Sequence, residues 1–283
     1  MGQLATAISS SYGFQTRVFC ILSDDRVYRS KSPEIFNRVM KRVGLNAMYV
    51  PFRVEPDQLG AAMNCLRILN IAGANVTVPY KERVLPFMDV LSEGANIIGA
   101  GNTIVCKDGI LKGYNTNAIG VMDALADTGF DIADKIALVF GTGGVARAVV
   151  FILKWLRAQS VYIVGRDETA AKQMSEKVGG EVIPFSADWG HEIPAHIVIN
   201  ATSVSSSDEA PELAEIVSKL NLTQCELLFD LNYGRHENFW ETTALNHQIR
   251  FMDGVSALAF QARRTFMLWT GLEVPSKEFQ DSL

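Results

Sequence analysis

The chain has 283 residues, 48% of them hydrophobic and 20% charged, which is enough apolar material for one or two buried cores and favours two domains. Its formal charge of -5 is spread along the sequence without a run of lysine or arginine, which argues against a nucleic-acid partner. The four cysteines form no CxxC pair, and Pro194 interrupts the close histidine pair His191 and His196, so no metal site is expected. The N-terminus lacks the pattern of a signal peptide, so we expect a cytoplasmic protein with its cysteines in the core.

The first third of the chain alternates short β-rich runs with amphipathic helical patterns. Strands are predicted at residues 18–22, 47–52 and 73–78. Between them, Ser32 and the following proline open one helix, and apolar residues at helical spacing between 59 and 69 predict a second. This alternation predicts an α/β layer with a mainly parallel sheet.

A second α/β series follows a helix predicted at residues 118–128. Its six strands are predicted at 136–140, 161–164, 182–184, 197–200, 227–230 and 250–252, with helices at 168–178 and 238–247. This is the full set of a doubly wound, Rossmann-type sheet. The last strong pattern, at 255–269, is a long helix that no strand follows, so we expect it to pack back on the first domain.

These patterns divide the chain into three parts. We expect an N-terminal α/β substrate domain at residues 1–117, a Rossmann-type dinucleotide-binding domain at 118–253, and a C-terminal helix at 254–283, with a cleft between the two domains. The polar run SVSSSDEAP at 203–211 is expected to be a mobile loop over a site, and its residue types indicate no chemistry of its own.

The segment GTGGVA follows a hydrophobic strand directly and opens a helix, which is the context of a dinucleotide cradle. Gly141 permits the tight turn, Gly143 lets backbone amides approach a pyrophosphate, and Ala146 keeps the helix close to the sheet. Together with Gly144 and Val145, these residues are the predicted cofactor-binding segment.

The second strand of this series ends at Arg166 and Asp167, where the adenosine ribose is expected. Arg166 would pair with the 2'-phosphate of NADP, whereas Asp167 would accept the ribose hydroxyls of NAD. Asp167 also precedes the helix at 168–178 and can serve as its cap, which tips the balance towards NADP and leaves NAD open.

Lys81 follows the strand end NVTVP, at the edge where parallel-sheet proteins bind ligands. Moving a hydride to or from an alcohol carbon requires a group that takes or gives the hydroxyl proton, and a lysine can do this when partial burial lowers its pKa. A lysine at the start of a helix is more often a solvated surface residue, so its position alone does not establish this role.

Several motifs, taken in order, resemble the shikimate dehydrogenase family across nearly the whole chain, from Ser30 to Gly271. The matching segments are the serine pair Ser30 and Ser32, NVTVPYKE, Asn102-Thr103, GYNT at 113–116, GTGGVARA, INATS at 199–203, Asp230 with Tyr233, and DG followed by Gln261. The order of so many matches makes the resemblance specific.

The resemblance implies an oxidoreductase that uses a nicotinamide cofactor on shikimate, quinate or a related cyclic polyol carboxylate, with Lys81 as general acid/base. It implies three residues at the substrate carboxylate, Ser30, Ser32 and Tyr233, and three at the ring hydroxyls, Thr77, Asn102 and Gln261. It also adds Thr202 and Gly254 to the cofactor-binding residues. Each of these side chains also has an ordinary structural explanation; for example, Ser32 before a proline is a good helix cap.

The chain departs from the family at Asn117, where an aspartate usually works with the lysine. A carboxylate there would raise the pKa of Lys81, so the asparagine predicts a lower pKa and a less well oriented amine. Asn117 can still hydrogen-bond a substrate hydroxyl, as donor and as acceptor. Arg29, near the carboxylate end, is either a second anion-binding group or a surface residue.

Two functions of different classes therefore stay open. The first is a shikimate dehydrogenase-type enzyme with a small-molecule substrate, acting as a monomer or homodimer. The alternative is a low-turnover protein that senses the cofactor or a shikimate-type ligand, favoured by the missing aspartate. A folate-interconverting dehydrogenase would not have the serine pair or the GYNT turn. A membrane partner is not expected, because glycines divide the most apolar segment, 136–156, into a strand, a turn and a helix.

Overall fold

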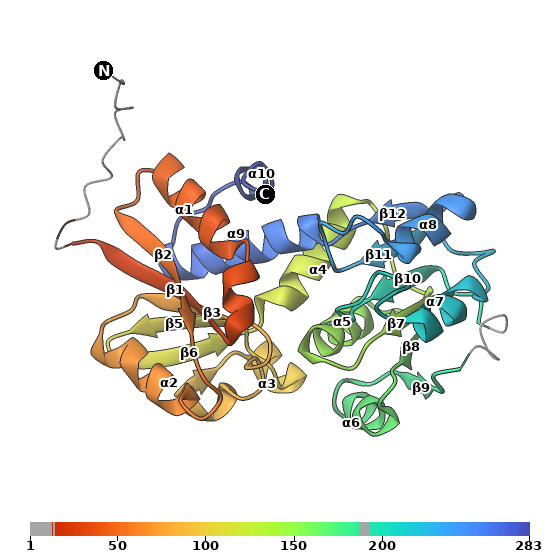
Figure 1. Ribbon diagram of the computed structural model, residues 1–283, viewed down its shortest axis with the longest axis horizontal. Coiled ribbons are helices and arrows are strands. Elements are labelled where there is room, and N and C mark those ends of the chain that lie inside the picture. The colour runs from red at the N-terminus through yellow and green to blue at the C-terminus, as the bar shows by residue number, and fades with distance from the viewer. Residues whose placement is uncertain (1–12, 14, 187–192) are drawn as a thin grey trace, which may run out of the picture.

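The computed structural model describes residues 13, 15–186 and 193–283, which form two six-stranded sheets (Figure 1). Two long helices, α4 (Thr116–Asp127) and α9 (Val255–Thr270), run side by side between the sheets. Gly120 permits their close approach, because a Cβ at this position would lie 2.5 Å from the carbonyl oxygen of Ala257. The predicted α/β class is confirmed.

The N-terminal sheet is mixed and has the strand order β2-β1-β3-β5-β6-β4. Its strands are β1 (Arg17–Ser23), β2 (Ala47–Arg53), β3 (Gly73–Val76), β4 (Val90–Leu91), β5 (Thr103–Lys107) and β6 (Ile110–Tyr114). The first three are parallel to one another, as the alternation of elements predicts, and β5 and β6 form an antiparallel hairpin. We did not predict the hairpin, although its turn, Asp108-Gly109 with positive φ at both residues, is a strong hairpin signal.

The C-terminal sheet has the strand order β12-β11-β10-β7-β8-β9, and every pairing in it is parallel. Its strands are β7 (Ile136–Phe140), β8 (Ser160–Val164), β9 (Glu181–Ile183), β10 (Ile197–Asn200), β11 (Leu227–Asp230) and β12 (Arg250–Met252). Each predicted strand is found within one residue at either end. The strand order reverses between β7 and β10, which is the switch point where doubly wound sheets bind ligands.

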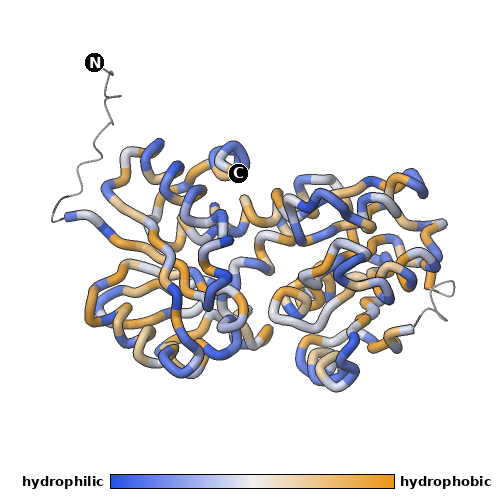
Figure 2. Tube along the Cα trace, in the orientation of Figure 1, coloured by the Kyte–Doolittle hydropathy of each residue, from blue (hydrophilic) through white to orange (hydrophobic). Residues whose placement is uncertain are grey.

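Helices cover both sheets, and their bounds follow local sequence signals. They are α1 (Ser32–Arg42), α2 (Leu59–Ile68), α3 (Glu93–Ile98), α5 (Gly144–Trp155), α6 (Glu168–Val178), α7 (Pro211–Ser218), α8 (Phe239–Asn246) and α10 (Ser276–Gln280), with 3-10 turns η1 (Asp25–Arg29) and η2 (Leu85–Phe87). Figure 2 shows mainly hydrophobic strands and helices that alternate between hydrophobic and hydrophilic residues. Pro211, which we assigned to a polar loop, is instead the first residue of α7.

Helix α9 contributes to the cores of both sheets. Ala257 and Phe260 pack in the core of the C-terminal sheet, whereas Phe266 and Trp269 pack in the core of the N-terminal sheet. The indole of Trp269 fits against β3 only because residue 73 is a glycine, since a Cβ there would lie 2.2 Å from the indole nitrogen. Helix α9 therefore packs against both sheets.

The four cysteines do not all lie in the core. Cys20 and Cys106 are buried, but Cys65 is exposed and Cys225 only half-buried, so the prediction of a core position is wrong for Cys65. In the described part of the chain no helix is long and apolar enough to cross a membrane, and no three potential metal ligands lie together. His191 lies outside the described residues.

Candidate active site

Two cavities meet between the sheets. The larger, of about 880 Å³, follows the carboxyl ends of β7, β8, β10 and β11. The smaller, of about 200 Å³, lies against the carboxyl ends of β1 and β3 and against α4 and α9. Both cavities are lined by Thr77, Lys81, Val145 and Leu231. The lysine that the sequence singled out therefore lies at the junction of the two cavities.

The backbone on either side of Lys81 is held by hydrogen bonds to neighbouring segments. Ser23 Oγ donates to the carbonyl of Val78 at 2.5 Å, and the buried Tyr80 Oη donates to the carbonyl of Val54 at 2.5 Å. Gly101 N donates to the carbonyl of Lys81 itself at 2.7 Å. Lys81 lies in a turn after β3 and does not begin a helix. These anchors restrict where its side chain can reach.

The side chain of Lys81 is only partly accessible to solvent, and burial lowers its pKa to about 8. No ion pair to Lys81 occurs among residues 13, 15–186 and 193–283. The direction of the shift is the one expected when no carboxylate accompanies the amine. Near pH 8 both the neutral and the charged form are populated, as a proton-transfer group requires.

The smaller cavity collects every residue predicted to bind the substrate. It is lined by Ser30, Ser32, Thr77, Asn102, Tyr233 and Gln261, together with Lys81 and Asn117. Ser32 is not the cap of α1, whose cap residue is Lys31, so the simple structural explanation for Ser32 does not hold. The roles of these side chains towards a substrate stay predictions, but their convergence from distant segments is seen.

The amide of Asn117 has a defined orientation. The backbone N of Thr116 donates to Asn102 Oδ1 at 2.7 Å, which fixes the orientation of the Asn102 amide. Asn102 Nδ2 then donates to Asn117 Oδ1 at 3.3 Å. Asn117 Nδ2 is then buried without a partner among the described residues. A buried donor without an acceptor costs about 1–3 kcal/mol, which a ligand acceptor would offset. The cavity therefore presents a donor at Asn117.

Sequence reasoning missed the buried layer beneath these two asparagines. The hydroxyls of Thr103, Thr116 and Thr265 lie 2.9–3.1 Å from one another and are fully buried. Asn102 Nδ2 donates to Thr116 Oγ1 at 2.9 Å. This cluster joins β5, α4 and α9, and so holds Asn102 in place. Thr103 and Thr116 belong to motifs of the sequence, but nothing in the sequence indicates that their hydroxyls meet that of Thr265.

The glycines of the cradle serve different purposes. Gly141 has φ of 118°, and a Cβ there would lie 2.9 Å from the carbonyl group of Ala201. Gly143 caps α5 and has nothing within 4 Å of an added Cβ, so its backbone faces open space in the larger cavity. At Gly144 an added Cβ would lie 3.2 Å from Ala100 Cβ, so the absence of a side chain here allows Ala100 of the N-terminal half to approach α5 closely.

The remaining residues of the cradle and the adenosine end also have defined places. Val145 lines both cavities. Ala146, on α5, is buried in the core and lines neither cavity, in agreement with a packing role. Asp167 caps α6, and its Oδ1 accepts from Ala170 N at 2.9 Å. Arg166 is exposed on the larger cavity, and no partner for it occurs among the described residues. Arg166 is thus available for a phosphate, whereas Asp167 is engaged.

Thr202, Gly254 and Arg29 differ in their position relative to the two cavities. Of the two residues that the resemblance adds at the cofactor, Thr202 lines the larger cavity, whereas Gly254 lines the smaller one. Its missing side chain makes room for the turn after β11, because a Cβ at Gly254 would lie 2.2 Å from the carbonyl oxygen of Leu231. Arg29 is exposed and lines neither cavity, which agrees with a surface residue.

An ion pair links the lysine turn to the cradle. Arg147 on α5 pairs with Glu82, the residue after Lys81, and the Arg147 side chain is 15% exposed. In the described part of the chain, this is the ion pair that joins the two sheets. The pair therefore helps to fix the distance between the Lys81 amine and the glycine-rich cradle.

Comparison with known proteins gives agreement over about nine tenths of the chain. A family model described as shikimate dehydrogenase substrate binding domain matches residues 23–104. A shikimate dehydrogenase (NADP(+)) of Desulforamulus reducens is 35% identical over 90% of this chain and 91% of that protein, and one of Pyrococcus furiosus is 36% identical over 92% of each.

Solved structures agree with these relatives. Shikimate dehydrogenase from Aquifex aeolicus has a TM-score of 0.86 and 30% identity, covering 95% of this chain and 98% of that one. The enzyme from Thermus thermophilus in complex with NADP(H) and shikimate has a TM-score of 0.83 and 29% identity, covering 94% and 98%. Because the similarity extends through both sheets and both cavities, the chain belongs to the shikimate dehydrogenase family.

Proposed function

We propose that this protein is an NADP-dependent oxidoreductase that interconverts a hydroxyl and a ketone on shikimate, quinate or a related cyclic polyol carboxylate. The observation that carries the proposal is the position of Lys81, whose side chain lines both the cradle cavity and the small polar cavity. The relatives named shikimate dehydrogenase (NADP(+)) and the Thermus thermophilus structure with NADP(H) and shikimate support the same substrate and cofactor.

The larger cavity fits a nicotinamide dinucleotide. The pyrophosphate of the dinucleotide would lie against the backbone of residues 141–145, at the N-terminus of α5. A side chain at Gly141 would disturb this backbone, because its Cβ would clash with the carbonyl group of Ala201. The 2'-phosphate of NADP would lie at Arg166, the free guanidinium at the end of β8. When bound there, the cofactor supplies the hydride donor or acceptor at the junction of the cavities.

Lys81 would move the proton that accompanies the hydride. In the oxidation direction the neutral amine accepts the hydroxyl proton as the carbon loses its hydride, and in the reduction direction the ammonium donates a proton to the alkoxide oxygen. A pKa of about 8 permits both directions near neutral pH. The amine does not require a carboxylate for either step, so Asn117 is compatible with turnover.

The smaller cavity would bind the substrate through neutral groups. Ser30, Ser32 and Tyr233 would hold the carboxylate, while Thr77, Asn102 and Gln261 would take ring hydroxyls. Such a set discriminates well, because a ligand that lacks a hydroxyl leaves buried polar groups unpaired. Asn117 would donate through Nδ2 to an oxygen of the substrate.

The proposed division of labour follows the two sheets. We place a substrate domain at residues 1–117, a cofactor domain at 118–253, and a bracing helix at 254–283. Residues of one chain line both cavities, which supports a single chain as the catalytic unit, as a monomer or within a homodimer. Light scattering after gel filtration distinguishes these two states.

Turnover of shikimate and quinate, followed by nicotinamide absorbance with NADP and with NAD, tests the function. We expect activity with NADP, and Lys81→Met to lower kcat about 100- to 10,000-fold while NADP still binds. Lys107→Met, at an exposed lysine on β5, is the control and should be unchanged. Binding of ligand and cofactor without turnover in the unmodified protein would contradict the proposal and indicate a sensor.

A further inference from the structure

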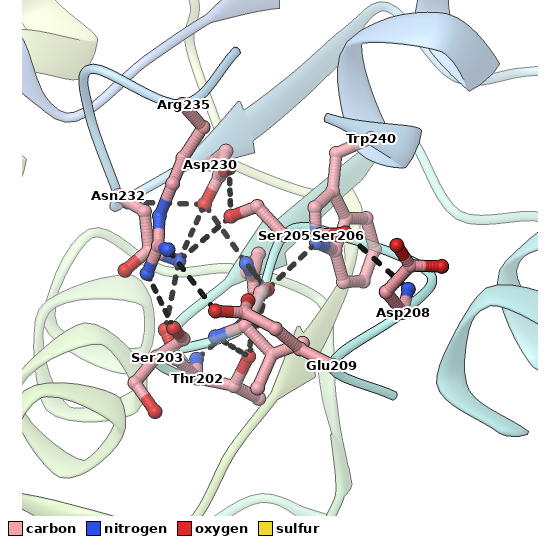
Figure 3. A network of polar contacts seen from close by, with 12 residues as sticks. Thr202, Ser203, Ser205, Ser206, Asp208, Glu209, Asp230, Asn232, Arg235 and Trp240 are labelled. Carbon is pink, nitrogen blue, oxygen red and sulfur yellow. Dashed lines mark hydrogen bonds and ion pairs between the residues drawn. The ribbon is translucent and has the colours of Figure 1, made fainter. Parts of the chain in front are cut away.

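Asp230, the last residue of β11, is a completely buried carboxylate held by neutral groups (Figure 3). Its Oδ1 accepts from Asn200 Nδ2 at 2.8 Å and from both the backbone N and the Nδ2 of Asn232 at 3.0 Å. Its Oδ2 accepts from Ser205 Oγ at 2.7 Å and from Asn238 Nδ2 at 2.8 Å. No cation pairs with Asp230 in the part of the chain that the structure describes. Hydrogen bonds therefore replace the lost hydration of its charge.

The donors to Asp230 come from separate segments that carry the walls of both cavities. Asn200 ends β10, and Ser205 anchors the loop that we expected to be mobile. Asn232 Nδ2 also donates to the carbonyl of Thr202 at 3.0 Å, so the turns after β10 and β11 are tied to each other. Figure 3 shows Thr202, Ser205 and Asn232 gathered around Asp230.

The turn that follows Asp230 supplies the wall where the cavities meet. Leu231 lines both cavities, Asn232 lines the larger one, and Tyr233 lines the smaller one. The bond from Asn232 N to Asp230 Oδ1 closes this turn two residues after the carboxylate. A shift of the turn would therefore move side chains at the substrate and at the cofactor together.

Gly254 also contacts the turn of residues 231–233. Its N–H donates to the carbonyl of Asn232 at 2.9 Å, and a Cβ at Gly254 would lie 2.2 Å from the carbonyl oxygen of Leu231. The turn is therefore held by a hydrogen bond to the Asp230 carboxylate and by close contact with Gly254, which has no side chain. The contact with Asp230 is a hydrogen bond, whereas the close approach at Gly254 is steric, so a substitution at either residue changes a different kind of interaction.

We propose that Asp230 is a positioning residue for the reaction, which holds the turn of residues 231–233 so that Leu231 and Tyr233 face the bound substrate and cofactor. This inference rests on the proposed function and adds a residue that does not itself contact either ligand. A displacement of about 1 Å in a positioned group can cost on the order of 100-fold in rate, so a wall held this tightly bears on turnover.

The position requires a carboxylate because only acceptors suit it. An asparagine at 230 would direct an NH2 group either at the backbone N–H of Asn232 or at the amide of Asn238. Asn238 cannot turn its amide around, because its Oδ1 caps α8 and accepts from Trp240 N at 2.9 Å. Asp230→Asn thus keeps the shape of the side chain and breaks the network.

The test compares Asp230→Asn and Gly254→Ala with a control in the same loop. Glu209→Gln is that control, because Glu209 is exposed and pairs with Arg235 at the surface. We expect Asp230→Asn and Gly254→Ala each to lower kcat/KM for shikimate about 10- to 100-fold, with a raised KM and an unchanged midpoint of the pH profile. Glu209→Gln should behave like the unmodified protein.

A merely structural role gives a different result. If Asp230→Asn lowers the Tm but leaves kcat and KM per folded molecule unchanged, the proposal is overturned. If Asp230→Asn does not fold, Ser205→Ala, which removes one donor, should lower kcat/KM about 3- to 10-fold, and no change in kcat/KM overturns the proposal.

Failure of the proposed function is separable from failure of this inference. If the unmodified protein turns over no substrate, the function fails, and cofactor binding becomes the readout. Asp230→Asn should then weaken binding of NADP but not of 2'-phospho-ADP-ribose, the fragment that lacks nicotinamide. Equal binding of NADP by both proteins would overturn the positioning role.

Discussion

The turn between β7 and α5 presents backbone to the larger cavity, whereas the N-terminal sheet and its loops present side chains to the smaller cavity. At the cradle, Gly141 and Gly143 contribute no side chain at all, and the helix N-terminus supplies the attraction for phosphate. In the smaller cavity, by contrast, hydroxyl and amide groups such as those of Ser32 and Asn102 converge on the space. A cofactor common to many enzymes suits a site made of backbone, and a particular substrate needs particular side chains.

This difference indicates which substitutions will be informative in each half. On the C-terminal side, adding a methyl group to Gly141 should be severe, because the added Cβ would meet the carbonyl group of Ala201. On the N-terminal side, exchange of one polar group for another should alter selectivity or pH dependence before it alters folding. The ion pair between Arg147 and Glu82 connects the two sides.

Among the substitutions that test this difference between the two halves, the largest effect is expected from Gly141→Ala. An alanine would have to adopt φ near 118° with its Cβ 2.9 Å from the Ala201 carbonyl, so the cradle would be displaced. We expect NADP binding, measured by calorimetry, to weaken about 100-fold or more. Gly94→Ala, in a helix of the other half with open space around it, is the control and should bind normally. Normal binding by Gly141→Ala would refute the backbone description of the cradle.

Arg166→Gln should come next, because Arg166 is the side chain proposed at the 2'-phosphate. Loss of a charge-assisted bond to the 2'-phosphate should weaken NADP binding about 10- to 100-fold and leave NAD binding unchanged. The cofactor dissociation constants measure this directly. Asp167→Asn, which keeps the helix cap, is the comparison and should have little effect. An equal loss for NAD and NADP would show that Arg166 does not contact the phosphate.

The pH dependence of oxidation should report on the N-terminal side. Because the neutral form of Lys81 accepts the proton, kcat/KM should fall about tenfold per pH unit below a midpoint near 8. Asn117→Asp would place a carboxylate near the amine, favour its charged form, and move the midpoint to higher pH by about one unit. A profile that is identical in Asn117→Asp would show that the residues do not interact.

The smallest effect is expected where the two halves are joined. Glu82→Gln removes the ion pair to Arg147, which should lower kcat about 2- to 5-fold, since partly exposed pairs contribute about 0.2–1 kcal/mol. A double-mutant cycle with Arg147→Gln measures the coupling. Additive losses in the cycle would mean that the pair does not set the geometry between the lysine turn and the cradle.

The sequence alone determined the elements whose signals are local. Each strand of the C-terminal sheet was predicted within one residue, because short apolar runs between turns are a property of neighbouring residues. The cradle and the cap at Asp167 were predicted for the same reason. The hairpin of β5 and β6 was equally local, and its Asp108-Gly109 turn was overlooked.

Only the tertiary structure decided which side chains meet. The resemblance named Asp230 and Gly254 as members of motifs, but their contact with one turn depends on packing between β11 and the start of α9. Asn117 Nδ2 has no partner within the described part of the chain, and this likewise follows from a backbone N–H that orients the side chain of Asn102. Such arrangements join residues far apart in the chain, and local propensity carries no information about which distant partners packing will bring together.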